Sequence, residues 1–197
     1  PIIVSHSFGG FVTILTGAEH GDRFAGIVIV DSPVNPPDRQ RHGPPTVRGG
    51  KVYPTLEAAL ARFRLAPPQP CENHFAMDYI ARWSLKKAPA PDGSGDGWVW
   101  KFDPSIWQRF SVSRPPQELL KNTRCRIALM KGDKSVIWED DVGDYMCDLL
   151  NRQVPFIEIP EARHHVMLDQ PLAFVAALRT LLQEWRHSEP NRIAPAR

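Results

Sequence analysis

The amino-acid sequence predicts an α/β fold in which helices flank a mostly parallel β-sheet. Short apolar runs rich in β-branched residues alternate with amphipathic helical patterns, and Ser, Gly, Asp or Pro residues end the runs. This alternation is typical of parallel strands connected by helical crossovers. Residues with reactive side chains also follow the ends of several runs, which is where a parallel sheet gathers its functional groups.

The first element combines a strand, a sharp turn and a helix. An apolar run at residues 2–4 leads into Ser-His-Ser-Phe-Gly at residues 5–9, and a helical pattern covers residues 11–18. At the apex of such a turn, Ser7 would be held in a strained conformation with its hydroxyl clear of the sheet. The backbone amide of Phe8 would then point to where an oxyanion forms. By itself, the stretch is equally compatible with a buried strand that ends in a Ser/Gly turn.

This kind of turn requires small residues two positions before and after Ser7, because the strand and the helix approach each other there. Gly9 meets the requirement on the helix side. On the strand side, Ser5 occupies the position of the first glycine in the usual Gly-x-Ser-x-Gly pattern, and it is small enough to be accepted.

Three further apolar runs predict the other strands, at residues 24–31, 125–131 and 155–159. Helical patterns accompany them at residues 142–151 and 171–185, and the second of these helices has a proline in its first turn. These runs and helices continue the α/β pattern to near the end of the chain.

The α/β pattern is interrupted between the second and the third predicted strand. Residues 34–50 are rich in Pro, Gly and Arg and have no usable periodicity. Helices are predicted at residues 55–65 and 73–86, an exposed strand at 98–102, and a short helix at 104–110. We therefore expect a mostly helical insertion within the α/β unit.

Charge and composition exclude several function classes. The 24 Lys and Arg residues nearly balance the 22 Asp and Glu residues, so a nucleic-acid partner is not expected. No apolar run approaches the roughly 20 residues of a membrane span, so a membrane partner is not expected either. The three cysteines lack metal-ligand spacing, which favours reduced thiols and a cytoplasmic location over disulfides or a structural zinc. The sequence contains no nucleotide or metal motif, and no cofactor is expected.

Three residues with the side chains needed for acyl transfer follow predicted strands. Ser7 follows the first strand, Asp31 ends the second, and His164 lies in the loop after the fourth. The carboxyl ends of parallel strands meet at one edge of the sheet, so we expect these side chains to lie close together. Their order along the chain, nucleophile then acid then histidine, differs from that in chymotrypsin and in subtilisin.

Four segments of the chain resemble the α/β-hydrolase fold family. They are Ser5–Gly10, Ile27–Pro33, Gly132–Ser135 and Pro160–Pro171. The last segment is similar to the family's Gly-His-x-x-x-x-Asp/Glu-x-Pro ending, with His164 in the place of the catalytic histidine. The resemblance extends over essentially the whole chain, which looks like the C-terminal two-thirds of a member with a serine nucleophile and a cap domain.

The resemblance implies a division of the chain. Residues 1–33 and 119–186 would form the α/β-hydrolase core, residues 34–118 a helical cap inserted into it, and residues 187–197 a disordered tail. The N-terminal strands of the fold would lie upstream of Pro1. The first strand reads as buried on both faces and would be an exposed apolar edge without them. We therefore expect the functional protein to be longer, and this chain alone to be poorly soluble or inactive.

The resemblance leaves the acidic residue open between two candidates. In the family, the usual position of the acid is three residues after Gly132, and Ser135 occupies it here. Asp31 is our choice, because some members take the acid from the end of the sixth strand of the fold. Asp133 is the second candidate, since it lies in the usual loop. The alternative interpretation of Asp31 is a turn-forming residue.

Together these residues predict a hydrolase of ester-like bonds. His164 would take a proton from Ser7 during attack on the carbonyl carbon, and Asp31 would stabilise the resulting imidazolium. The Phe8 amide would supply one oxyanion donor, and the second would come from upstream of the chain. The aromatic residues of the insertion are compatible with the lining of an apolar pocket, but the favoured interpretation is that most of them form the insertion's own core. The expected substrate is a small apolar or aromatic ester, lactone or diketone.

Two other functions stay open at this point. A non-catalytic protein of the same fold would bind a small ligand beneath the cap. Ser135 in the usual acid position, and Arg163 in place of the glycine that commonly precedes the histidine, favour that interpretation. A C–C bond hydrolase or lyase would use the same scaffold. His6 is interpreted as a packing group beside the elbow and His165 as a polar loop residue. The sequence predicts no oligomeric state.

Overall fold

The computed structural model describes residues 1–39, 51–90, 93, 95–103, 105–109 and 114–188. Its main sheet has four parallel strands in the order β1-β2-β5-β6. These strands are β1 (Ile2–His6), β2 (Gly26–Val30), β5 (Arg126–Gly132) and β6 (Phe156–Ile159). The predicted parallel sheet and the approximate positions of all four strands are confirmed.

The register of the sheet brings the carboxyl ends of its strands to one edge. His6 pairs with Val30, Val30 pairs with Met130, and Gly132 pairs with Ile159. The residues that follow β1 and β2 are therefore neighbours, although they are far apart in the sequence. β1 forms an edge of the described sheet, where Ile2 and Val4 are exposed, so the second neighbour expected for this strand is not among the described residues.

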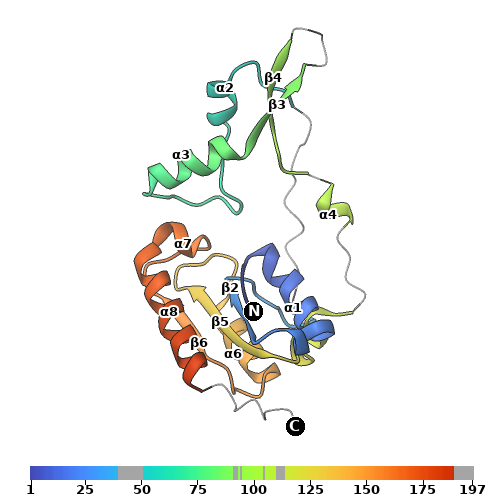
Figure 1. Ribbon diagram of the computed structural model, residues 1–197, viewed down its shortest axis with the longest axis vertical. Helices are drawn as coiled ribbons and strands as arrows, with labels where there is room; N and C mark the ends of the chain where they lie inside the picture. The colour runs from blue at the N-terminus through green and yellow to red at the C-terminus, as the bar shows by residue number, and fades with distance from the viewer. Residues whose placement is uncertain (40–50, 91–92, 94, 104, 110–113, 189–197) are drawn as a thin grey trace, which may run out of the picture.

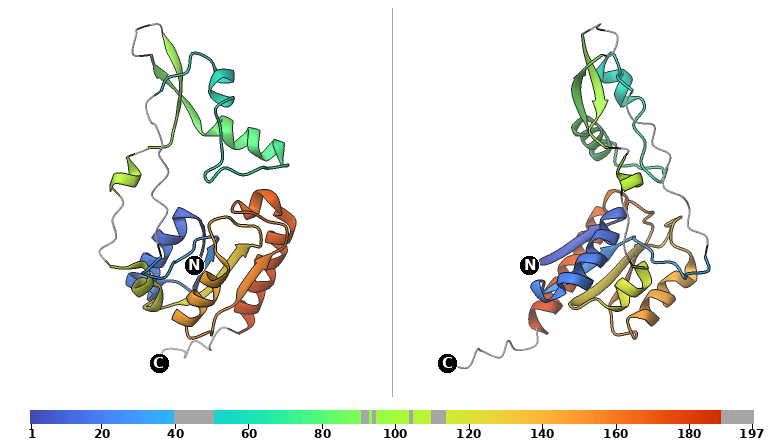
Figure 2. Two further views of the ribbon diagram at one scale, coloured as in Figure 1. Left: turned by 180° about the vertical axis from the view of Figure 1, so that it is seen from behind. Right: turned by 90° about the vertical axis from the view of Figure 1, so that its right-hand side faces the viewer.

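Helices cover both faces of the sheet (Figure 2). One face packs against α1 (Phe8–His20), α5 (Pro116–Lys121) and α6 (Asp140–Leu149), and the other packs against α8 (Pro171–His187).

The central strand β2 separates the two layers of core, because successive side chains of a strand point to opposite faces. Ile27 and Ile29 belong to the cluster that includes Met146 of α6, whereas Val28 and Val30 join the cluster that includes Trp185 of α8. Every residue of β2 is buried, which explains the continuous apolar run in the sequence.

The segment between β2 and β5 contains a small antiparallel sheet as well as helices (Figure 1). Its elements are α2 (Leu56–Leu60), α3 (His74–Trp83), β3 (Leu85–Pro89), β4 (Asp96–Trp100) and α4 (Ile106–Arg109). In Figure 1, α2, α3, β3 and β4 lie beyond the main sheet, on the side where α7 (Val166–Asp169) is found.

The helix predicted over residues 73–86 is too long, because α3 ends at Trp83. Leu85 instead pairs with Trp100, and the amide of Lys101 donates to the carbonyl of Ser84. The run at 98–102 was expected to be an exposed strand; β4 overlaps it and is paired with β3. Cross-strand pairing outweighs the helix propensity of the Leu85-Lys86 sequence.

Several other boundaries differ from the sequence-based expectation. The helix expected over residues 55–65 ends at Leu60, and the loop carrying His164 contains the short helix α7. α5 and a 3₁₀ turn at Gly21–Arg23 were not anticipated. α8 extends to His187, the first residue of the expected tail, whereas residues 189–197 lie outside the described residues, as do residues 40–50 of the expected irregular stretch.

Two further features of the structure concern membrane-spanning helices and the cysteines. Within the described residues, none of the helices has both the length and the apolarity needed to cross a membrane. Cys71, Cys125 and Cys147 are free thiols. Burial raises the pKa of the Cys125 thiol and of the Cys147 thiol, which disfavours their reactive thiolate forms.

β5, the other interior strand of the sheet, supplies a direct test of the core. Leu129 is fully buried, so replacing it by Ala should lower the free energy of unfolding by about 2–5 kcal/mol, through lost burial and an unfilled cavity. Leu172 on α8 is 85% exposed, and Leu172→Ala is the matched control, with an expected change within about 0.5 kcal/mol. Urea unfolding followed by circular dichroism measures both. Equal losses in the two variants would contradict this description of the core.

Candidate active site at the carboxyl edge of the sheet

Ser7 lies at a sharp turn between β1 and α1. Its backbone has φ 54° and ψ −125°, a conformation that is strained for a residue with a side chain. The Ser7 amide donates to the Val30 carbonyl at 3.0 Å, and the Ser7 carbonyl accepts from the Gly10 amide at 2.9 Å. The Ser32 hydroxyl donates to the same carbonyl at 2.7 Å. Backbone and side-chain hydrogen bonds therefore hold the turn from both sides.

The tightest approach near the turn is at Gly10, not at Gly9. A Cβ atom added to Gly9 would lie 3.8 Å from Cβ of Ser5, which is ordinary van der Waals contact. A Cβ atom added to Gly10 would lie 2.2 Å from Oγ of Ser32, the hydroxyl that bonds the Ser7 carbonyl. Small residues were expected at positions 5 and 9, but the space for a side chain is tightest at Gly10.

Asp31 follows β2 and is completely buried. Its own backbone is in the left-handed region, with φ 47°. Oδ1 accepts a hydrogen bond from the amide of Gly132 at 3.0 Å, and Oδ2 accepts one from the hydroxyl of Ser135 at 2.5 Å. A carboxylate that only accepts hydrogen bonds suits this environment, because each of its oxygens faces a donor.

His164 lies in the loop after β6, and its ring is also completely buried. Nδ1 is 2.7 Å from Oδ2 of Asp31, and Nε2 is 2.9 Å from Oγ of Ser7. Because an ionised carboxylate can only accept, Nδ1 carries the proton and Nε2 is left to accept from the Ser7 hydroxyl. The imidazole therefore connects the serine to the carboxylate.

Gly132 lets the histidine loop approach the end of β5. A Cβ atom at this position would lie 2.3 Å from the carbonyl oxygen of Ala162 and 2.5 Å from that of Arg163. The amide of Lys134 donates to the Ala162 carbonyl at 2.9 Å, which fixes the loop to the turn after β5. The absence of a side chain at Gly132 thus helps to bring His164 within reach of Asp31.

The structure brings together three of the residues selected from the sequence, Ser7, Asp31 and His164. Asp133, the second candidate for the acid, is exposed on the surface, and its amide bonds the carbonyl of Ile159. Phe8 is the first residue of α1, directly after the turn. Ser135 is the group that sequence reasoning missed: it occupies the usual acid position and donates to Asp31 instead.

Two more histidines lie against His164, although the sequence predicts only packing and surface roles for them. The His6 ring is 4.6 Å and the His165 ring 4.8 Å from the His164 ring, measured between centroids. Nε2 of His6 donates to the carbonyl oxygen of His164 at 2.8 Å, since a carbonyl can only accept. The available signals were the histidine directly before Ser7 and the His-His pair in the loop after β6.

Both neighbouring histidines are neutral near pH 7. Burial lowers the pKa of His165 to about 4, with the positive charge that His164 and His6 can carry as further causes. Burial is also the largest cause of the lowered pKa of His6. Because these rings carry little positive charge, they do not oppose formation of an imidazolium at His164.

Gln69, in the segment between β2 and β5, is hydrogen-bonded to the histidine loop. Its amide nitrogen donates to both carboxylate oxygens of Asp169 at 3.1 Å, and its amide oxygen accepts from the His165 amide at 3.0 Å. Asp169 also accepts from the amide of Arg163 at 2.7 Å. These bonds tie the inserted segment to the loop that carries His164.

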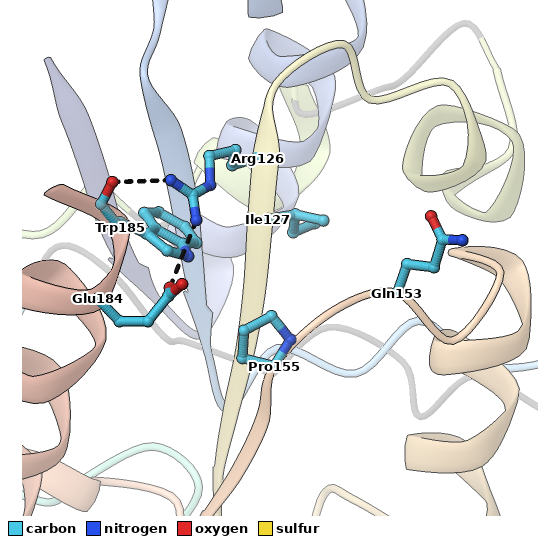
Figure 3. A pocket seen from close by; sticks show the side chains of 6 residues that line it. All are labelled: Arg126, Ile127, Gln153, Pro155, Glu184 and Trp185. Carbon is cyan, nitrogen blue, oxygen red and sulfur yellow. Dashed lines mark hydrogen bonds and ion pairs between the residues drawn. The ribbon is translucent and has the colours of Figure 1, made fainter. Parts of the chain in front are cut away.

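A separate cavity of about 310 Å³ lies at the other end of the strands (Figure 3). It is lined by Arg126, the first residue of β5, and by Trp185 of α8, whereas Ser7 follows the carboxyl end of β1. The Arg126 guanidinium stacks over the Trp185 ring and bonds the Trp185 carbonyl at 2.9 Å. We interpret these contacts as packing of α8 on the sheet.

A serine at a strand-to-helix turn of a parallel sheet, with a histidine and an aspartate at the same edge, is the arrangement typical of α/β hydrolases. The chain belongs to the alpha/beta hydrolase family, whose sequence model matches residues 1–178. No curated protein matches the sequence.

Solved structures with the same fold share little sequence with this chain. A hydrolase of E-2-(acetamidomethylene)succinate is 16% identical with a TM-score of 0.67, and the match covers 92% of this chain and 66% of that one. An esterase from Mycobacterium tuberculosis is 19% identical with a TM-score of 0.63, covering 92% and 60%. A peroxisomal alpha-beta-hydrolase from Saccharomyces cerevisiae is 15% identical with a TM-score of 0.70, covering 100% and 57%. The matches therefore span 57–66% of the length of these proteins.

The close approach at Gly10 predicts different outcomes for two similar substitutions. Gly10→Ala should lower the free energy of unfolding by about 1–3 kcal/mol, because the new methyl group displaces the Ser32 hydroxyl that holds the elbow. Gly9→Ala is the matched control and should cost under about 1 kcal/mol, because its methyl group meets only ordinary contact. Urea unfolding measures both changes. A larger loss for Gly9→Ala than for Gly10→Ala would contradict this account of the elbow.

Proposed function

We propose that this protein is a serine hydrolase that cleaves an ester-like bond in a small apolar substrate. The observation that supports this most is the hydrogen-bond chain from Ser7 through His164 to Asp31, with distances of 2.9 Å and 2.7 Å. A nucleophile in contact with a base, and the base in contact with an orienting acid, is the arrangement that activates a hydroxyl group. The three residues follow different strands, so local sequence proximity does not explain their contact.

The proposed reaction begins with attack by Ser7 Oγ on the carbonyl carbon of the substrate. His164 Nε2 accepts the hydroxyl proton, and Asp31 stabilises the imidazolium through the bond to Nδ1. His164 then donates the proton to the leaving group, which departs and leaves an acyl group on Ser7. Water activated by the same histidine releases the acid product and regenerates the serine.

Phe8 is proposed to stabilise the oxyanion through its backbone amide. It is the first residue of α1, so the positive end of the helix dipole lies at the same position. The turn geometry at Ser7 fixes the direction in which the chain leaves the strand, which is the arrangement of a nucleophile elbow.

Residues 34–118 are proposed to act as a cap that bounds the substrate site. The bonds from Gln69 to Asp169 and to the His165 amide support this, because they attach the segment beside His164. Similar structures include proteins named as an esterase and as a hydrolase of an acetamidomethylene succinate, and both names are compatible with attack on a carbonyl group. We include a reducing, cytoplasmic setting in the proposal, because the three cysteines are free.

A fluorophosphonate probe tests whether Ser7 is activated. The full-length protein should be labelled on Ser7 and should hydrolyse p-nitrophenyl acetate, and Ser7→Ala should abolish labelling and lower kcat by a factor on the order of 10⁶. Asp31→Asn should lower kcat by roughly 10⁴-fold, because the imidazole loses the partner that fixes its tautomer.

Asp133→Asn is the matched control and should keep wild-type activity, because Asp133 is exposed and does not contact His164. Circular dichroism checks that each variant is folded. If the folded wild-type protein is not labelled, the non-catalytic ligand-binding alternative is favoured. If Asp31→Asn stays fully active and Asp133→Asn does not, the assignment of the acid is wrong.

A further inference from the structure

Three imidazole rings converge beside Ser7. One ring nitrogen from each of His6, His164 and His165 can be chosen so that all three nitrogens lie within 4.8 Å of one another. In a tetrahedral zinc site, with ligand distances of about 2.0–2.1 Å, neighbouring ligand nitrogens are roughly 3.3 Å apart. Binding of one ion by all three rings therefore requires the nitrogens to approach one another by up to about 1.5 Å.

The hydrogen bonds of the three rings show which nitrogens are available. His6 uses Nε2–H to donate to the His164 carbonyl, so the lone pair of its neutral ring is on Nδ1. His164 binds Asp31 through Nδ1, so its lone pair is on Nε2. In the described part of the chain, Nε2 of His165 is buried and has no hydrogen-bond partner.

The orphaned nitrogen of His165 points to a ligand. A buried polar atom without a partner is uncommon in folded proteins and costs free energy, which binding of a cation would recover. Asp31 adds a negative charge to this cluster through its bond to His164, which favours a cation further. Imidazole nitrogens are the preferred ligands of zinc, copper and nickel, whereas calcium and magnesium prefer oxygen.

We propose that His6, His164 and His165 form a binding site for a zinc-class transition-metal ion, and that the bound ion inhibits the hydrolase. The consequence for activity rests on the proposed function. Nε2 of His164 cannot coordinate the ion and accept the Ser7 proton at the same time, because both use the same lone pair. The ion therefore competes with the serine for the base, and its removal restores activity.

Zinc titration tests the inhibition. Zn²⁺ should inhibit hydrolysis of p-nitrophenyl acetate reversibly, and EDTA should restore the rate. His165→Ala should keep most of its basal activity, since His165 lies outside the proposed reaction path, but should raise the inhibition constant by about tenfold or more. His20→Ala is the matched control, because His20 is exposed at the opposite end of α1, and its inhibition constant should equal that of the wild type.

A direct binding measurement separates the metal site from the proposed reaction. Isothermal titration of the Ser7→Ala variant with Zn²⁺ should show one ion per chain, and the Ser7→Ala/His165→Ala double variant should bind about tenfold more weakly or not at all. Equal zinc affinity in the two variants, or no binding to Ser7→Ala, overturns the metal site. Zinc binding by a protein that a fluorophosphonate does not label would retain the metal site and refute the hydrolase.

Discussion

The buried contact between Asp31 and His164 is the constraint on which the site depends. A carboxylate removed from water is costly unless donors surround it, and Asp31 is completely buried. Gly132, Ser135 and His164 supply those donors, from the end of β5, the turn after it and the loop after β6. The Asp31 side chain thus forms hydrogen bonds with three segments. These bonds position His164 against Ser7.

Ser135 contacts the acidic residue of the site, Asp31, which follows a different strand. The resemblance to the family implied an acid at position 135, where this chain has a serine. In this chain the Ser135 hydroxyl reaches the carboxylate of Asp31 at 2.5 Å, from the neighbouring strand end. The two strands are adjacent and parallel, so their ends lie side by side, and either can supply the group that faces the histidine.

The sequence was sufficient to predict the main sheet and the three residues at its edge. Parallel strands with fully buried runs end abruptly, so the residues after them could be placed at a common edge from the sequence alone. The contacts of Ser135, Gln69, His6 and His165 could not be predicted in this way. They join segments about 100 residues apart in most cases, and they depend on loop conformation, which local patterns do not determine.

The inserted segment was predicted less well than the sheet, for a related reason. Leu85 and the lysines after it are good helix formers, and only their pairing with β4 makes them a strand. The pairing partner lies beyond a Gly-rich turn that carries no apolar periodicity. Tertiary pairing therefore determined the structure where the local signal was ambiguous, whereas β2, buried on both faces, was clear from its composition.

The most direct test of the central claim is the proton resonance of the His164 ring, measured by NMR on protein with isotopically labelled histidine. A hydrogen bond of 2.7 Å from Nδ1–H to a buried carboxylate should give a slowly exchanging, strongly downfield signal. This signal should be present in the wild type and in Asp133→Asn, and absent in folded Asp31→Asn. A signal that survives in Asp31→Asn would contradict the account, because Asp31 would then not be the partner that orients His164.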